Sequence, residues 1–231
     1  MIYWNGKSSN DLNVIVEYYP RRIIPARKME IETIPGRSGD VIFPQDAFEN
    51  YVQPYSVYLS AARPRLPTVA RQAALWLQVP GYHKLYDSYD RDCFRLAYFM
   101  GGTDLENIFN EYGRATIEFN CMPQRFTLDG DELRPMFAPA VLVNPSEFTA
   151  LPLIIIHGAG AGTLTVGSYT VSLTDCNGVN LDSMADDAYR GSTNMNPTVT
   201  GTLPKLPAGN SPVSWSGGIT HIEIKPRWWT L

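Results

Sequence analysis

Proline and glycine each occur eighteen times in this chain of 231 residues and are spread along its whole length. Both residues end strands and shape turns, and proline inside a helix removes a backbone hydrogen bond. Such frequent interruption leaves room for many short strands and for few long helices. We therefore expect a mainly β fold.

Period-two alternation of side chains supports this expectation. Ala115, Ile117, Phe119 and Cys121 alternate with polar neighbours. This pattern is typical of a strand that is buried on one face. Residues 94–100 also alternate, but both of their sets contain apolar side chains, so we expect that strand to be covered on both faces.

One helix is predicted over residues 67–79, a segment rich in alanine and leucine. Pro67 suits the first turn, where its missing N–H is not needed, and Pro80-Gly81 should end the helix. One apolar stripe should face the core, with tryptophan as its anchor. Its members are Val69, Ala73, Trp76 and Leu77.

A boundary between two domains is predicted near residues 138–147. A segment with many prolines cannot form a helix or a central strand, because the amides are missing. We therefore assign residues 1–139 to a first domain and 140–231 to a second. The four prolines are Pro135, Pro139, Pro145 and Pro152.

Two-residue turns in the second domain predict hairpins and, with them, a small antiparallel sandwich. The three turn signals are Gly167-Ser168, Asn177-Gly178 and Gly217-Gly218. The first turn would pair Val166 with Tyr169 and Leu164 with Val171. The third would pair Ser216 with Ile219, Trp215 with Thr220 and Val213 with Ile222.

The glycine-rich run GAGAG at residues 158–162 follows an apolar segment. A dinucleotide-binding loop would need a helix next, so that the helix N-terminus faces the phosphate. Residues 163–166 alternate like a strand instead. We interpret the run as a flexible loop between strands and predict no nucleotide site.

Two segments carry clustered side-chain oxygens, the ligands that calcium prefers. Neither has the spacing, central glycine and distal glutamate of an EF-hand loop. We expect solvated turns in both, and no metal site. The first segment contains Asp87, Asp90 and Asp92, and the second contains Asp175, Asn177, Asn180 and Asp182.

Histidines and cysteines give no indication of catalysis. The histidines lack ligand spacing, no Gly-x-Ser-x-Gly elbow occurs, and no Cys-x-x-Cys pair exists. We expect the cysteines to be buried or free thiols, and we predict no enzyme, no catalytic, cofactor-binding or metal-binding residues, and no cofactor. The residues concerned are His83, His157, His221, Cys93, Cys121 and Cys176.

The net charge of −4 argues against a general nucleic-acid binder, which carries a basic excess. The longest apolar runs, residues 140–143 and 153–156, are far shorter than the ~20 residues of a membrane span. No apolar run of signal-peptide length begins the chain. We expect a soluble protein without a membrane partner, whose aromatic residues fill cores and interfaces.

Several segments occur in an order that spans nearly the whole chain. In the first half they are NDLNVIV at residues 10–16, IPGRSGD at 34–40, WL at 76–77, YHKLYD at 82–87, DCFRLAY at 92–98 and FNCMPQRF at 119–126. The second half runs from LPLIII at 151–156 to the final Trp-Trp. This order resembles the distal tail protein of long-tailed, non-contractile phages, the Dit family.

The resemblance implies two β-sandwich domains, the first with a helix and an extended hairpin and the second galectin-like. Six copies would form a ring through residues 1–139, with residues 140–231 pointing outward. Made in the bacterial host cytoplasm, the ring would lie at the distal end of the virion tail. It would join the tail tube protein to the tail-associated hub or lysin protein and to the receptor-binding protein. DNA would pass through its lumen without specific binding.

Two other functions are open at this point. The C-terminal sandwich could be a carbohydrate-binding adsorption module, with Trp228 and Trp229 as exposed aromatic residues that stack on sugars. A tail-associated hydrolase would instead have to draw on the scattered histidine and aspartate residues.

Overall fold

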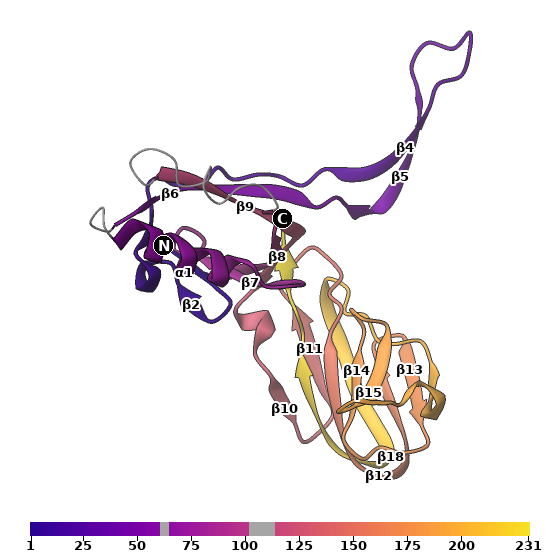
Figure 1. Cartoon of the computed structure of the whole chain (residues 1–231). Helices are drawn as coiled ribbons and strands as arrows, with labels where there is room; N and C mark the ends of the chain where they lie inside the picture. The colour runs from indigo at the N-terminus through magenta and orange to yellow at the C-terminus, as the bar shows by residue number, and fades with distance from the viewer. Residues whose placement is uncertain (61–64, 102–113) are drawn as a thin grey trace. The chain divides into compact units, whose positions relative to one another are not determined.

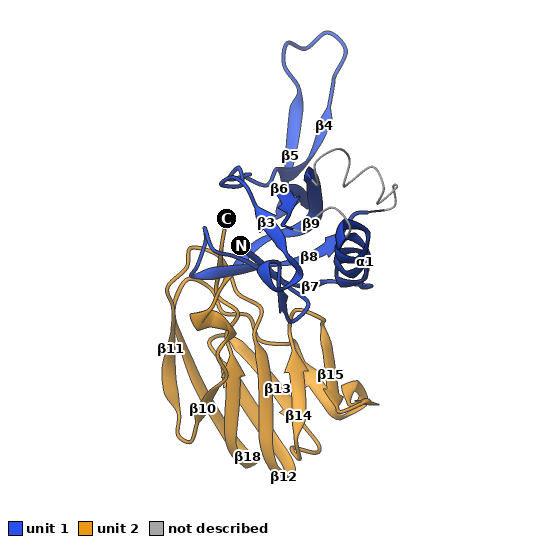
Figure 2. Cartoon of the chain, turned by 60° about the vertical axis from the view of Figure 1, so that its left-hand side comes forward, with its two compact units in different colours: residues 1–125, 231 blue, residues 126–230 orange. Residues whose placement is uncertain are grey.

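The computed structural model describes residues 1–60, 65–101 and 114–231, and the fold is mainly β, as predicted (Figure 1). The chain forms two compact units, residues 1–125 with 231 and residues 126–230 (Figure 2). The division falls between Arg125 and Phe126, earlier than the 139/140 boundary expected from the prolines. The reason is that residues 134–136 pair with a strand of the second unit.

Unit 1 is built on one sheet with the strand order β2-β1-β7-β8-β9-β6-β3. Alternate residues of the paired strands β6 and β9 point to one core, which includes Tyr55, Ile117 and Phe119. This confirms the one-sided strand predicted from residues 115–121. The strands are β1 Ile2–Trp4, β2 Lys7–Ser8, β3 Val14–Val16, β6 Tyr51–Leu59, β7 His83–Asp87, β8 Cys93–Phe99 and β9 Arg114–Thr127, and a short 3-10 helix, η1, covers Asn10–Leu12.

The second alternating strand, β8, differs from its prediction. Both of its faces are buried only over residues 93–95, while Leu96 and Tyr98 are partly exposed. The inward set is Arg95 and Ala97, so a charged residue occupies a core position of this strand.

The predicted helix is α1, Leu66–Leu77, and its buried residues are the four of the predicted stripe. Trp76 is 4% exposed, and its Nε1 donates a hydrogen bond of 2.7 Å to the Trp4 carbonyl. The tryptophan therefore anchors the helix on the sheet, as expected. Gly81, with φ +84°, follows the helix end.

Strands β4, Arg27–Glu32, and β5, Val41–Phe48, form a separate two-stranded sheet. Figure 2 shows this hairpin as an arm that leaves the rest of unit 1. It is the extended hairpin that the resemblance implies. None of its residues is fully buried.

Unit 2 is organised by two long strands, β12 Leu153–Val166 and β18 Gly209–Lys225, which pair with each other. The other strands are β10 Arg134–Met136, β11 Ala140–Asn144, β13 Tyr169–Leu173, β14 Val179–Asp182, β15 Asp187–Arg190, β16 Thr193–Asn194, β17 Val199–Gly201 and β19 Trp229–Thr230. Two 3-10 helices, η3 Asp129–Asp131 and η4 Asn196–Thr198, complete the unit.

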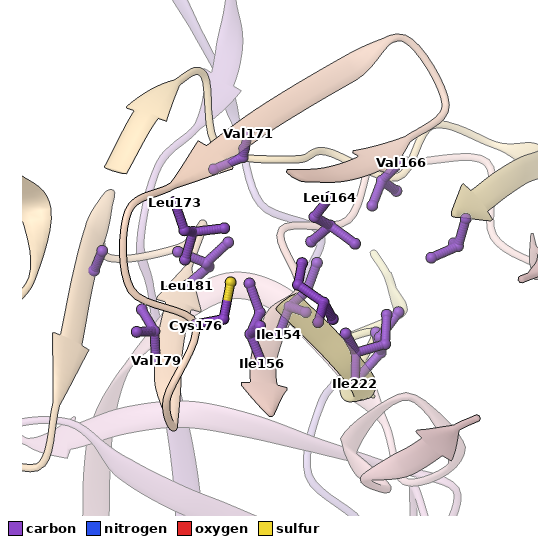
Figure 3. Packing of buried hydrophobic residues seen from close by; sticks show 14 of the residues in the cluster. Ile154, Ile156, Leu164, Val166, Val171, Leu173, Cys176, Val179, Leu181 and Ile222 are labelled. Carbon is purple, nitrogen blue, oxygen red and sulfur yellow. The ribbon is translucent and has the colours of Figure 1, made fainter. Parts of the chain in front are cut away.

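The two long strands belong to both layers of a sandwich. One half of the pair is flanked by β10 and β14, and the other half by β11 and β13. Ile154 and Ile156 from the first half and Leu164 and Val166 from the second lie in the same core (Figure 3). Strands that bend and change layers are a known way to close such a core.

The two long strands bend at the glycine-rich run, residues 158–162. Two predictions about this region are wrong. The run is part of β12, not a flexible loop, and Gly217-Gly218 lies inside β18, not at a hairpin turn. The pairing register shifts here, with Gly158 opposite Ile219 and Gly162 opposite Gly217. A Cβ atom on Gly218 would lie 1.8 Å from the Ala159 carbonyl oxygen, so glycine permits the close approach of the two backbones.

The other two turn signals have different outcomes. The turn at Gly167-Ser168 is confirmed, with Leu164 opposite Val171 and Val166 opposite Tyr169. The hairpin at Asn177-Gly178 is wrong, because β13 and β14, which it connects, each pair with β12. Positive φ at Gly178 serves a connection between layers instead.

The proline-rich segment has the expected character. Pro135 lies in β10, an edge strand, where a missing amide is tolerated.

The three cysteines are buried free thiols, as predicted, and burial raises the pKa of Cys121 to about 12. Within the described ranges, no helix has the length and apolar character needed to cross a membrane.

Candidate functional site

The β4–β5 hairpin presents an apolar patch on one of its faces. Met29 lies opposite Pro44, and Ile31 lies opposite Ile42. Directly opposed residues share a face of a two-stranded sheet, so these four side chains form one patch. Met29 is 50% exposed, Ile31 58% and Ile42 55%. We call this patch the hairpin apolar face.

An exposed face of this kind is suited to contact with another protein surface. A two-stranded hairpin is only marginally stable by itself in water. Covering the exposed part of each isoleucine, a little over half of its surface, would contribute about 1–1.5 kcal/mol. The opposite face is mixed, because Glu30 lies opposite Phe43, which is 50% exposed, and Glu32 lies opposite Val41. The hairpin apolar face is therefore the strongest candidate interaction surface in the described part of the chain.

Sequence reasoning did not single out this face. Its signal is the alternation of Met29 and Ile31 with Glu30 and Glu32, which predicts a strand with one apolar side. What the pattern cannot show is that this side stays exposed among the described residues of unit 1.

The first oxygen-rich segment forms a buried ion-pair network instead of a solvated turn. Asp87 is 5% exposed, and its Oδ2 accepts bonds from Arg95 Nη1 at 2.8 Å and from the Tyr55 hydroxyl at 2.9 Å. Its Oδ1 accepts hydrogen bonds from the backbone amides of Tyr89 and Asp90. The prediction of a solvated turn is wrong here, because Arg95 occupies a core position of β8.

The network continues through Asp90. One of its carboxylate oxygens lies 3.3 Å from Arg95 Nη2 and 3.0 Å from Arg125 Nη1. Asp92, by contrast, is exposed, as predicted. Burial would lower the pKa of Arg95, but Tyr55, Tyr51 and Asp87 raise it above its ordinary value, so the guanidinium stays charged. The arrangement holds strands together and presents no free carboxylate.

Two aspartates of the second oxygen-rich segment also form ion pairs with arginines. Arg190 Nη2 lies 2.7 Å from Asp175 Oδ2, and Arg227 donates two bonds to Asp182, one of 2.9 Å. Asn180 Nδ2 donates to the Tyr189 carbonyl. No group of three histidine, cysteine, aspartate or glutamate side chains that could hold a metal ion occurs among the residues described.

The end of the chain closes unit 2. Arg227 has φ +60°, and its amide donates to the Gly130 carbonyl. Trp228 is 1% exposed and packs in the core. Its backbone lies so close to Gly130 that a Cβ atom on Gly130 would be 2.4 Å from the Trp228 backbone nitrogen. The prediction that Trp228 is an exposed aromatic residue is therefore wrong.

Trp229 is partly buried and already has partners within unit 2. Its ring stacks on Phe148 at 4.2 Å, and its Nε1 donates to the Thr149 carbonyl at 3.0 Å. The aromatic pair that motivated a saccharide site thus serves the packing of unit 2.

We expect the Asp182–Arg227 pair to make unit 2 less stable in acid. Burial raises the pKa of Asp182, but the hydrogen bonds and charge of Arg227 outweigh it and leave that pKa below its ordinary value. The stabilisation is present above about pH 4, where the unfolded carboxyl is ionised, and is lost as pH falls through the folded pKa.

Arg227→Gln should therefore cost roughly 2–3 kcal/mol at pH 7 and less at pH 2–3. Urea unfolding of both proteins at the two pH values measures the difference. An equal cost at the two pH values would show that the ion pair does not carry it.

The histidines do not form a catalytic arrangement. In unit 2 the rings of His157 and His221 stack at 4.4 Å with an interplanar angle of 2°. Thr220 Oγ1 lies 3.1 Å from His221 Nδ1 but donates its hydrogen to the His157 carbonyl. His83, in unit 1, lies 3.0 Å from the Pro80 carbonyl through its Nε2.

No protein-family model and no curated protein sequence matches the chain. Two of the solved structures with a similar fold are phage proteins. The first is the SPP1 Dit (gp 19.1) protein, described as a paradigm of the hub adsorption apparatus in phages that infect Gram-positive bacteria. Its TM-score is 0.72 at 13% identity, with 96% of this chain and 97% of that chain covered.

The second is in the phage P2 baseplate in its activated conformation with Ca, with a TM-score of 0.55 at 9% identity. That likeness covers 92% of this chain and 89% of the other. The two comparisons confirm the expected resemblance at the level of the fold.

Proposed function

We propose that this chain is a structural subunit of a phage tail tip and that it forms a ring-shaped hub. The observation that carries the proposal is the likeness to SPP1 Dit, whose fold matches over 96% of this chain and 97% of that one. Because the match extends over both units, it is not a likeness of one common sandwich alone. Fold is weak support for function by itself, so a second observation is needed.

The hairpin apolar face supplies that second observation. Heterologous contacts between copies close into a ring when the rotation angle permits. An arm with an exposed apolar face can make such a contact with the next copy. In this account residues 1–139 form a six-membered ring, and residues 140–231, a sandwich of galectin-like type, point outward.

The ring would lie at the distal end of the tail. It would connect the tail tube protein to the tail-associated hub or lysin protein and to the receptor-binding protein. DNA would cross the lumen without specific binding, which the net charge of −4 favours. The chain would perform no catalysis, and its work would be to bind other subunits.

Self-association should depend on the hairpin apolar face. Ile31→Lys combined with Ile42→Glu places opposite charges on directly opposed residues, so the hairpin itself keeps a favourable cross-strand pair. Losing the burial of both isoleucines should weaken association at least ~100-fold. Analytical ultracentrifugation over a range of concentrations measures this change.

The matched control places the same pair of charges on the other face. Glu30 and Phe43 are also directly opposed, and Glu30→Lys with Phe43→Glu should leave association within about threefold of the parent chain. Equal loss in both variants would assign the effect to the hairpin as a whole. No loss in the first variant would remove the hairpin apolar face from the interface.

A further inference from the structure

A small cavity in unit 1 is lined by arginines. Its volume is about 90 Å³, and the charged residues around it are Arg21, Arg22, Arg95, Arg125, Asp87 and Asp90. Pockets for drug-sized ligands measure ~300–1,000 Å³, so this one has room for an ion or for the tip of a side chain.

The carboxylates of the lining are already used by two of the arginines. Asp87 pairs with Arg95, and Asp90 pairs with Arg125, at 2.8 Å and 3.0 Å. Both oxygens of Asp87 also accept other hydrogen bonds, from the Tyr55 hydroxyl and from two amides. This part of the lining is therefore neutral and has no spare acceptor on Asp87 for another cation.

Arg21 and Arg22 add two positive charges that no carboxylate balances in the described part of unit 1. Both side chains are exposed, and within residues 1–60, 65–101 and 114–231 neither has an ion-pair partner. Their segment is held at the cavity by Gln53, which is 1% exposed and donates to the Arg21 carbonyl at 3.2 Å. The cavity therefore carries a net positive charge.

Arg125 provides a second sign of an absent acceptor. It is 2% exposed, and its Nε has no hydrogen-bond partner in the described part of the chain. Its Nη1 and Nη2 are bound to Asp90 and to the Ile23 carbonyl. A buried donor without a partner costs about 1–3 kcal/mol, so an acceptor near this guanidinium would be favourable.

We infer that the arginine-lined cavity of unit 1 binds a small oxyanion, either a carboxylate or a phosphate-type ion. Planar guanidinium groups present paired N–H donors that match the oxygens of such groups. Arg21 and Arg22 supply the unbalanced charge, and Arg125, which also lines the cavity, has a buried Nε without a hydrogen-bond partner among the described residues.

The oxyanion can come from two sources. It can be a free ion such as phosphate, or it can be an aspartate or glutamate side chain of a second copy of this chain. The free-ion source does not depend on the proposed ring, and the second source does. An experiment with two readouts separates them.

The test uses the full chain, inorganic phosphate as the probe, and Arg21→Gln combined with Arg22→Gln. The control is Arg65→Gln with Arg71→Gln, two exposed arginines of unit 1 away from the cavity lining. Melting is followed at constant ionic strength, because phosphate also stabilises proteins generally by exclusion from their surface. If the ion is free, phosphate raises the melting temperature saturably, by about 5 °C. The Arg21/Arg22 variant then loses this shift, and the control keeps it.

If the source is a second copy, phosphate has no specific effect on melting. Self-association then falls at least ~10-fold in the Arg21/Arg22 variant and stays unchanged in the control. The inference is overturned if both variants respond to phosphate alike and also associate alike. A monomeric chain that binds phosphate through these arginines would uphold the site even if the ring proposal fails.

Discussion

Replacing Gly218 by alanine should prevent unit 2 from reaching its native packing, with a loss of at least ~4 kcal/mol. A Cβ atom there would lie 1.8 Å from the Ala159 carbonyl oxygen, a backbone atom that cannot rotate away. Gly158 faces the same contact from the other strand, at 2.1 Å from the Gly218 oxygen. The substitution would therefore push apart the two long strands where both change layers.

Gly160→Ala is the matched control, because it lies in the same bend with open space around it. Its φ of +72° makes alanine strained, but nothing lies within 4 Å of the added Cβ. We expect a loss of only ~1–2 kcal/mol. Denaturant unfolding followed by tryptophan fluorescence compares the two variants, and a wild-type midpoint for Gly218→Ala would refute the described bend.

Asp87→Asn should destabilise unit 1 by about 3–5 kcal/mol, the second large effect. The change keeps the shape of the side chain but removes the charge that Arg95 faces at 2.8 Å. Arg95 has 5% of its side chain exposed, so its guanidinium would stay largely buried beside a neutral side chain. The Tyr55 hydroxyl would also lose a carboxylate acceptor.

The exposed neighbour Asp92 gives the control, and Asp92→Asn should change stability by less than about 0.5 kcal/mol. A double-mutant cycle tests the mechanism further. Adding Arg95→Met to Asp87→Asn should recover part of the loss, because no unpaired charge is then buried. Losses that simply add would mean that the two residues act independently.

Local patterns were sufficient where the structure is local. The stripe Val69, Ala73, Trp76 and Leu77 depends on helical period alone, and it is the buried face of α1. The Gly167-Ser168 turn likewise joins strands that are neighbours in sequence, so turn chemistry fixed the pairing register.

The same rules could not predict contacts between residues that are far apart in the sequence. Glycines serve both tight turns and close backbone approach, and the partner that decides between these uses lies far away in sequence. For Gly218 that partner is Ala159, so a hairpin and a bend gave the same local signal. The expectation that residues 163–166 form a strand is confirmed, because they belong to β12. The interpretation of residues 158–162 as a loop is wrong, because they belong to the same strand.

The burial of the charged side chains of Asp87 and Arg95 could not be predicted from the sequence either. Asp87 lies among other aspartates, a composition typical of solvated turns, yet Arg95 and Tyr55 enclose it. The alternation in residues 94–100 contained the signal, since Arg95 shares its face with Ala97, but the apolar set on the other face dominated the interpretation. The hairpin apolar face shows the reverse case, an apolar pattern that stays exposed among the residues of unit 1 that the structure describes.

The solution mass of the purified full chain, with images of the same fraction, tests the proposed hub most directly. Light scattering should give a species near six times 25.8 kDa, and negative-stain images should show rings with a central hole. A chain that stays monomeric at every concentration and forms no ring would contradict the proposal.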